Sequence, residues 1–149
     1  MILSHEVVVN KPLQVVWDYS NNPDNLNKWL NDFIRYEQVT GDSSAPGPGD
    51  KSNHTYRQGN SEFTMEETIT IYEPPHRIEL LMTSSHFDME IVNRFEENEP
   101  GKTKLFASAE FIRVGWMMKI ISFFSSIKKM QSDHERQINK LKGLIESEA

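Results

Sequence analysis

Residues 115–148 read GWMMKIISFFSSIKKMQSDHERQINKLKGLIESE. At about 100° per residue, the apolar side chains of this segment share one face of a helix, and most charged side chains fall on the other face or its margin. The pattern predicts one long amphipathic helix over Gly115–Glu148, which must bury its apolar face against a sheet. That face carries Trp116, Ile120, Phe123, Phe124, Ile127, Met130, His134, Ile138, Leu141 and Ile145.

The chain before this helix, from Arg35 to Ile112, is dominated by short runs in which apolar and polar residues alternate. Runs with one apolar face are typical of an antiparallel sheet that meets water on one side, and the short connections favour a meander. Two short helices, one around Trp17 and one around Trp29, are expected after the first strand. The predicted strands are Ile2–Val9, Phe33–Val39, Ser52–Gln58, Phe63–Ile71, Ile78–Met82, Phe87–Phe95 and Leu105–Phe111.

Several short motifs follow one another in a recognisable order. They are NKPLQVVWDY at 10–19, NPDNLNKWL at 22–30, EE at 66–67 with YEPPHR at 72–77, GKTKL at 101–105 and LKGLIE at 141–146. Together they resemble the START-like superfamily of helix-grip proteins (SRPBCC), which includes polyketide cyclase/dehydrase-like and birch-pollen-allergen-like groups. Asn22 stands where an aspartate is usual in that pattern.

This resemblance implies an α+β helix-grip fold over residues 1–149, taken as one ligand-binding domain. The fold would have a seven-stranded antiparallel curved sheet wrapped around a long C-terminal helix, with two short helices between strands one and two. A cavity between sheet and helix would hold small apolar molecules. Members of the superfamily include carriers, enzymes, hormone sensors and chaperone co-factors, so the resemblance leaves the function open.

Composition narrows the possible partners. A net charge of −6 disfavours nucleic acid and anionic membranes. The chain has no cysteine, which excludes disulfides and thiolate catalysis. The N-terminus does not read as a signal peptide, so a cytoplasmic protein is expected. The most apolar window, Ile112–Ile127, is too short to span a bilayer, so no stable membrane insertion is expected. The histidines show no metal-ligand spacing, and neither a metal nor a cofactor is expected.

Glu67 is the most informative carboxylate. It keeps the phase of Phe63, Met65, Ile69 and Ile71, so strict alternation places it on the inner face of the sheet. A buried carboxylate there could anchor a ligand or act as an acid/base. The alternatives are a bulge that turns Glu67 outward, or a structural pair with an arginine such as Arg57 or Arg94.

Other polar residues could contribute single contacts. His134 lies at the centre of the apolar helix face, where a histidine more often bonds a backbone carbonyl than a ligand. Tyr36, His54, Tyr56 and Asn93 could each orient a ligand in an apolar pocket. Trp17 and Trp29 are interpreted as core and cap residues of the short helices.

Met117, Met118 and Ile121 lie off the main apolar stripe, so the start of the predicted helix is apolar nearly all round. Such a belt is usually covered. A loop of the fold or a homodimer partner could cover the belt, or the belt could form the rim of a cavity entrance that meets ligand or membrane. The dimer and the entrance are favoured.

The leading hypothesis is a non-catalytic protein that binds or carries a small hydrophobic molecule, such as a lipid, polyketide, isoprenoid or aromatic. One alternative is a cyclase- or hydratase-like enzyme that uses Glu67 or His134 as acid/base. Another is a protein-interaction module that uses the Met117–Ile121 belt. The predicted cavity residues are Phe33, Tyr56, Phe63, Met65, Glu67, Leu80, Met82, Phe87, Met89, Ile91, Trp116, Ile120, Phe124 and Ile127.

Overall fold

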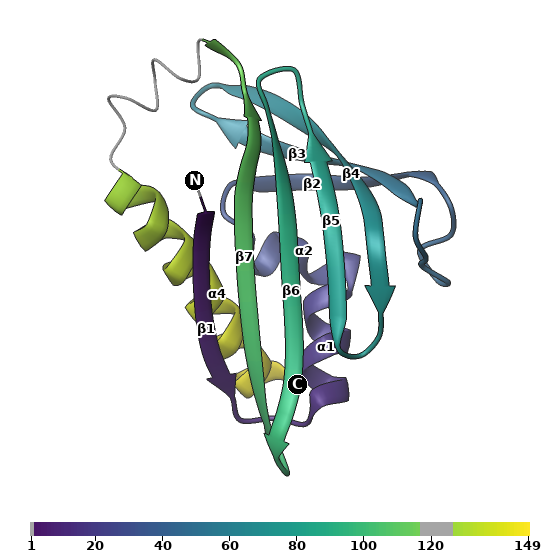
Figure 1. The fold of residues 1–149 in the computed structure, drawn as a ribbon, viewed down its shortest axis with the longest axis vertical. Coiled ribbons are helices and arrows are strands. Elements are labelled where there is room, and N and C mark those ends of the chain that lie inside the picture. The colour runs from purple at the N-terminus through teal and green to yellow at the C-terminus, as the bar shows by residue number, and fades with distance from the viewer. Residues whose placement is uncertain (1, 117–126) are drawn as a thin grey trace.

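The computed structural model describes residues 2–116 and 127–149. A curved antiparallel sheet holds a long helix and three shorter helical segments on its concave side (Figure 1). In chain order the elements are β1 (Ile2–Val9), α1 (Leu13–Asn21), η1 (Pro23–Asn25), α2 (Leu26–Trp29), β2 (Phe33–Thr40), β3 (Lys51–Gln58), β4 (Ser61–Glu73), β5 (Arg77–Thr83), β6 (Phe87–Glu99), β7 (Lys102–Val114) and α4 (Ile127–Glu148). This is the helix-grip architecture that the motifs predicted.

The seven strands lie in the order β1-β7-β6-β5-β4-β3-β2. From β2 to β7 each strand pairs with its successor, which is the predicted meander, and β1 joins the far edge against β7. The β3–β4 hairpin shows how a local signal sets this register. Gly59 takes φ +60° in the two-residue turn, and Gln58 therefore pairs with Ser61.

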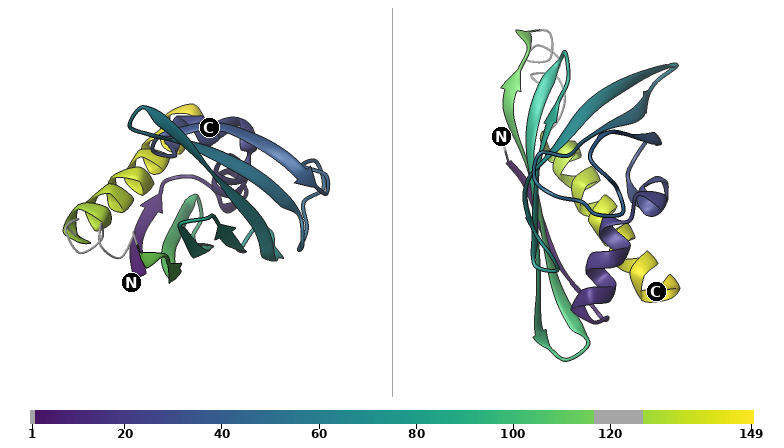
Figure 2. Two further views of the ribbon diagram at one scale, coloured as in Figure 1. Left: turned by 90° about the horizontal axis from the view of Figure 1, so that it is seen from above. Right: turned by 90° about the vertical axis from the view of Figure 1, so that its right-hand side faces the viewer.

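The helical segments cover the concave face of the sheet, which curls toward them (Figure 2). Pro12 precedes α1 in an extended conformation that suits a helix start. Asn22 then caps the next segment, because its side-chain oxygen accepts the Asp24 N–H at 3.0 Å. Asparagine thus performs the capping role at the position where the resembled pattern has aspartate.

The main core lies where α1 and the end of α4 meet the sheet. Trp17, only 4% exposed, packs its ring against Tyr72 at 5.7 Å and Phe95 at 5.1 Å between centroids. Leu141 and Ile145 of α4 are fully buried beside them. The interpretation of Trp17 as a core residue is confirmed. This core fills one end of the sheet–helix space and leaves the other end open for a cavity.

One sequence-based assignment was wrong within β4. Strict alternation placed Ile71 on the inner face, but the register shifts between Ile69 and Ile71, so Ile71 pairs with Glu79 and Tyr72 pairs with Ile78. A bulge adds one residue to β4, and every side chain after it changes face. Tyr72, not Ile71, therefore packs against the core.

The predicted C-terminal helix is present as α4 over Ile127–Glu148. Its earlier part, residues 117–126, lies outside the described residues. None of the described helices is both long and apolar enough to span a bilayer.

Candidate functional site

A cavity of about 460 Å³ lies between the concave face of the sheet and the helices that cover it, and it is partly open to solvent. Its walls come from all seven strands, from the β2–β3 loop, from the end of α1 and the η1–α2 region, and from the first half of α4. The volume falls in the range of small-molecule sites, roughly 300–1,000 Å³. The lining is mainly apolar, with Leu3, Leu26, Trp29, Leu30, Phe63, Met65, Ile69, Tyr72, Ile78, Leu80, Met82, Phe87, Met89, Ile91, Ala107, Ala109, Phe111, Met130 and Ile138 among its residues.

The structure brings most of the predicted cavity residues together. Inner-face positions of β3 to β6 supply them, since period-two alternation is unbroken through these positions. That they bind a ligand stays a prediction. Those that line the cavity are Tyr56, Phe63, Met65, Glu67, Leu80, Met82, Phe87, Met89 and Ile91.

Phe33 was assigned to the cavity, but it is not among the lining residues. The register of β2 shifts directly after Phe33, so its neighbours no longer alternate as the sequence suggested. Its ring packs edge-on against His54 at 5.8 Å and Tyr56 at 5.7 Å between centroids. Phe33 therefore supports two lining rings from outside the cavity.

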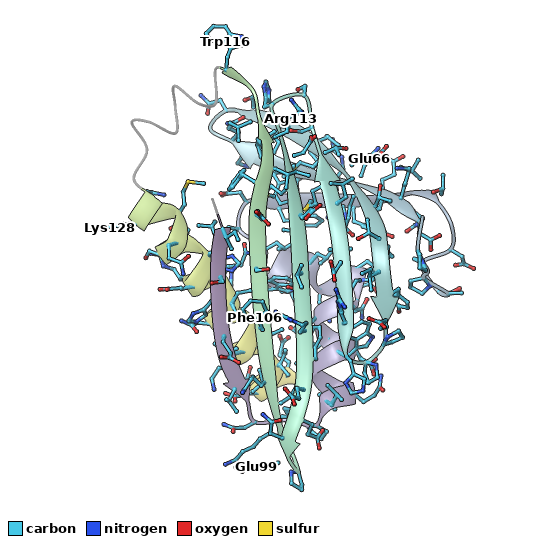
Figure 3. All side chains as sticks on the ribbon, in the orientation of Figure 1. Glu66, Glu99, Phe106, Arg113, Trp116 and Lys128 are labelled. Atoms are coloured by element: carbon cyan, nitrogen blue, oxygen red, sulfur yellow. The ribbon has the colours of Figure 1, made fainter. Side chains whose placement is uncertain are left out.

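Trp116 was also assigned to the cavity, but it is 72% exposed. The reason is that β7 runs to Val114, where it still pairs with Phe87, so Trp116 comes just beyond the end of the sheet. Figure 3 shows it pointing away from the body of the molecule.

The other predictions for this region fall on residues that the structure does not describe. Ile120, Phe124 and the Met117–Ile121 belt lie outside the described residues, as does the side chain of Ile127. The proposed entrance, homodimer surface and interaction module at this belt stay predictions.

Glu67 lines the cavity beside His54. Glu67 Oε2 lies 3.3 Å from His54 Nε2, which is also 3.1 Å from Ser52 Oγ. The two side chains are 17% and 4% exposed. Glu67 is not turned outward and has no arginine partner among the described residues, so both structural alternatives weighed for it were wrong. Arg94 instead lies over the Phe106 ring, 4.7 Å from its centroid.

Burial drives this pair toward neutrality. It raises the pKa of Glu67 to about 7 and lowers the pKa of His54 to about 4, because each charged form loses its hydration. Near neutral pH Glu67 is poised between its two forms, whereas His54 is an uncharged imidazole. A carboxyl group with this behaviour can hold a ligand group or exchange a proton with it.

Two tyrosines, Tyr36 and Tyr56, join Glu67 and His54 in the cavity lining and form a polar cluster with them. Burial raises the pKa of Tyr56, and the neighbouring Glu67 carboxylate raises it further. Burial also raises the pKa of Tyr36, with additional contributions from Glu67 and Asp50. Both phenols therefore stay protonated, and the Tyr36 hydroxyl already donates to Gln38.

His134 has the structural role that was weighed as the commoner one. Its Nε2 donates to the backbone carbonyl of Ala107 at 3.1 Å. Burial is the main reason that its pKa is lowered, so the ring is neutral. His134 therefore links α4 to β7, although it also lies in the cavity lining together with Asn93.

Sequence reasoning missed Ser52 and gave His54 no special weight. The two-residue turn at Gly59-Asn60 gives a signal for both residues. If the β3–β4 pairing is continued from Gln58 opposite Ser61, Ser52 lies opposite Glu67 and His54 lies opposite Met65. Trp29 was interpreted as a core residue, and it is buried, but it also lines the cavity. Among the described residues no group of three or more histidine, aspartate or glutamate side chains could hold a metal ion.

The fold and its cavity define a helix-grip protein, and comparison with known families agrees. The model of the family described as polyketide cyclase / dehydrase and lipid transport matches residues 2–146, and the chain belongs to this family. A comparison with curated proteins gives no significant match in sequence.

Solved structures show the same fold at low sequence identity. Protein CV1439 from Chromobacterium violaceum has a TM-score of 0.74 at 15% identity, with 99% of each chain covered. The Zhui aromatase/cyclase from Streptomyces sp. R1128 has a TM-score of 0.73 at 13% identity, covering 98% of this chain and 93% of that one. Norcoclaurine synthase from Thalictrum flavum, in complex with dopamine and hydroxybenzaldehyde, has a TM-score of 0.67 at 15% identity, covering 100% and 88%.

Proposed function

We propose that residues 1–149 act as one domain that binds or carries a small, mainly apolar molecule between the sheet and α4, without chemical turnover. The observation that carries the proposal is the cavity of about 460 Å³, which is walled by apolar inner-face residues and has a polar cluster at one end. Burial of a ligand's apolar surface would supply affinity at about 25 cal/mol per Å².

The polar cluster would orient the ligand. Glu67, His54 and Tyr56 all line the same part of the cavity, on neighbouring strands β3 and β4. A few polar groups in an apolar pocket fix which end of a ligand enters first. The methionines Met65, Met82 and Met89 would adapt the walls, because their flexible side chains fill irregular spaces.

The family supports binding of this kind, since its description includes lipid transport as well as polyketide cyclisation. Norcoclaurine synthase, a distant neighbour in fold, was solved with small aromatic compounds. These likenesses support a small-molecule site and do not choose among lipid, polyketide, isoprenoid and aromatic ligands.

Native mass spectrometry of protein purified from its own host tests the proposal directly. We expect a non-covalent adduct that disappears on denaturation. In parallel, the neutral dye N-phenyl-1-naphthylamine should gain fluorescence with the folded protein and lose it when an extracted ligand is added back. If the protein carries no adduct and binds no dye, the proposal fails.

An enzyme is the second candidate, because the buried Glu67 carboxyl has its pKa raised to about 7 and lies 3.3 Å from a neutral imidazole. Such a group could move a proton in a cyclisation or dehydration. Once a ligand is known, Glu67→Gln separates the two functions. Turnover that is lost in this variant while binding is retained would establish the enzyme, and the absence of any turnover in the wild type would leave the binding protein.

A further inference from the structure

The polar end of the cavity carries carboxylates that have no cationic partner among the described residues. Glu67, Asp50 and Asp42 are all lining residues, and none forms an ion pair with a described lysine or arginine. The Asp42 carboxyl accepts the Ser44 N–H within the β2–β3 loop. Backbone hydrogen bonds hold the chain at Asp50 beside β4, whereas the Asp50 carboxyl accepts the Gly47 N–H at 2.9 Å within its own loop. Ile69, two residues after Glu67, donates its N–H to the Asp50 carbonyl at 3.0 Å and accepts the Gly49 N–H at 2.7 Å.

The basic residues nearby are directed elsewhere. Lys51 belongs to the lining, but its Nζ lies 3.0 Å from Glu66 Oε1 and 2.8 Å from Thr68 Oγ1, side chains that alternate with Glu67 and face the other side of the sheet. His54 is uncharged near neutral pH. At the opposite wall, Asp133 is neutralised by Lys129 and Arg136. Glu67 is therefore a buried lining carboxyl whose ionised form has no described lysine or arginine to balance it.

Aromatic rings lead from this end along the wall. Tyr56 stacks on Phe63 with 5.5 Å between centroids and 24° between planes. Phe63 contacts Phe87, which in turn contacts Phe111 at 5.5 Å. Ring faces accept both apolar groups and cations, and a cation within about 6 Å of a ring is attracted by its quadrupole.

From this arrangement we infer that the cavity selects an aromatic or other apolar amine, with the protonated amine against Glu67 and the apolar body along the aromatic row. This inference rests on the proposed function and adds the chemical class of the ligand. An ammonium group supplies the positive charge that no described lysine or arginine provides for Glu67. A ligand carboxylate would instead add a like charge to the same pocket, and an alcohol would leave the charge unbalanced.

His54 leaves the charge of Glu67 unbalanced, because its ring is uncharged near neutral pH. When Nε2–H points toward Glu67 and Ser52, Nδ1 is left as an acceptor, and Nδ1 is buried without a partner among the described residues. The side chain is only 4% exposed, so this acceptor has no ready access to bulk water. Nδ1 is equally closed to a ligand in the cavity, so the part that His54 plays is to place an uncharged ring, and no competing cation, beside Glu67.

Amine binding should depend on pH in a defined way. The titratable lining groups on the elements around Glu67 are His54 and Tyr56 of β3, Tyr36 of β2, and Asp42 and Asp50 of the β2–β3 loop, and none of them is a cation near neutral pH. Since Glu67 is partly protonated below pH 7, the ammonium group must displace its proton. The affinity for the amine should therefore rise between pH 6 and pH 8, whereas that for a neutral analogue should stay flat.

Calorimetric titration with three ligands of equal apolar body tests the inference. The ligands are a naphthylethylamine, the matching naphthylethanol and naphthylacetate. At pH 8 we expect the amine to bind at least about tenfold tighter than the alcohol, and the acetate more weakly than both. Glu67→Gln should remove most of the amine's advantage over the alcohol, whereas the control Glu66→Gln, on the preceding residue of the same strand, should leave that advantage as it is in the wild type.

The outcomes separate the two proposals. If the alcohol binds but the amine has no advantage, or if its advantage survives Glu67→Gln, the amine inference is overturned and the binding function stands. If none of the three ligands binds and no dye binds, the proposed function fails, and the amine inference fails with it. The pH series on the wild-type protein decides the same question without any variant, because a flat affinity for the amine contradicts the inference.

Discussion

Glu67 should make the stability of the fold depend on pH. Its pKa is raised from 4.5 to about 7, so the folded state retains a proton that the unfolded chain loses. This group's contribution to stability is complete below pH 4.5 and is lost as the pH rises through 7. A shift of this size corresponds to at most about 3 kcal/mol, and the side chain is only 17% exposed.

Glu67→Gln keeps the shape of the side chain and removes its charge. We expect the variant to be about 1–3 kcal/mol more stable than the wild type at pH 8 and nearly equal to it at pH 5, because only the ionised carboxyl pays for its burial. Urea unfolding at both pH values measures this. Glu66→Gln is the control, since Glu66 is a half-exposed partner of Lys51. A Glu67→Gln effect of the same size at both pH values would contradict the assignment.

The loop between β2 and β3 has a conformational requirement at Gly41. Gly41 has φ +83°, and a Cβ placed on it would lie 2.3 Å from the Asp50 carboxyl group. The same carboxyl group accepts the Gly47 N–H at 2.9 Å, so it cannot move away without losing a bond. Both the backbone and the available space therefore require glycine at this position.

Gly41→Ala should destabilise the protein by about 1–3 kcal/mol and weaken ligand binding, since Asp50 lines the cavity. Gly47→Ala is the matched control in the same loop, because a Cβ at Gly47 would have no neighbour within 4 Å and its φ is not left-handed. Thermal unfolding and dye titration of the two variants provide the comparison. Equal melting temperatures would show that the loop relaxes around the added methyl group.

Helix α4 contributes to stability through its buried face. Ile145 is fully buried against the core, and we expect Ile145→Ala to cost about 2–5 kcal/mol, because the lost side chain leaves a cavity. Gly143 lies two residues earlier with open space around it, and Gly143→Ala should stabilise the helix by about 0.5–1 kcal/mol. Denaturant unfolding should therefore give effects of opposite sign. A loss of stability in Gly143→Ala would mean that α4 needs glycine there.

The arrangement of elements could be predicted from the sequence because its signals are local. Alternation identified the strands, the Gly59-Asn60 turn identified a hairpin, and the motifs at 10–30 and 141–146 indicated which superfamily the chain resembles. Side-chain direction could be predicted only where alternation is unbroken. The bulge that turns Tyr72 inward and the register shift at Phe33 leave no local signature, since both depend on the partner strands.

The chemistry at Glu67 was harder to predict than its position. The alternation of apolar and polar residues was enough to place this carboxyl on the inner face of the sheet. The identity of its partner, however, depends on the pairing of β3 with β4, which brings Ser52 opposite Glu67 and His54 two residues further along β3. Long-range pairs with arginine were equally consistent with composition. The raised pKa of Glu67 follows from burial in the assembled cavity, which no local pattern reports.

The cavity as a whole can be tested by filling it. Ile91 of β6 lines its wall between Leu80 and Ala109, so the larger ring of Ile91→Trp would extend into the ligand space. We expect at least a tenfold weaker affinity for the dye, or about 1.4 kcal/mol, with little loss of stability because the added ring enters empty volume. Val92→Trp, on the next residue of β6 and outside the lining, should bind the dye as the wild type does. Equal affinity in both variants would place the ligand elsewhere on the molecule.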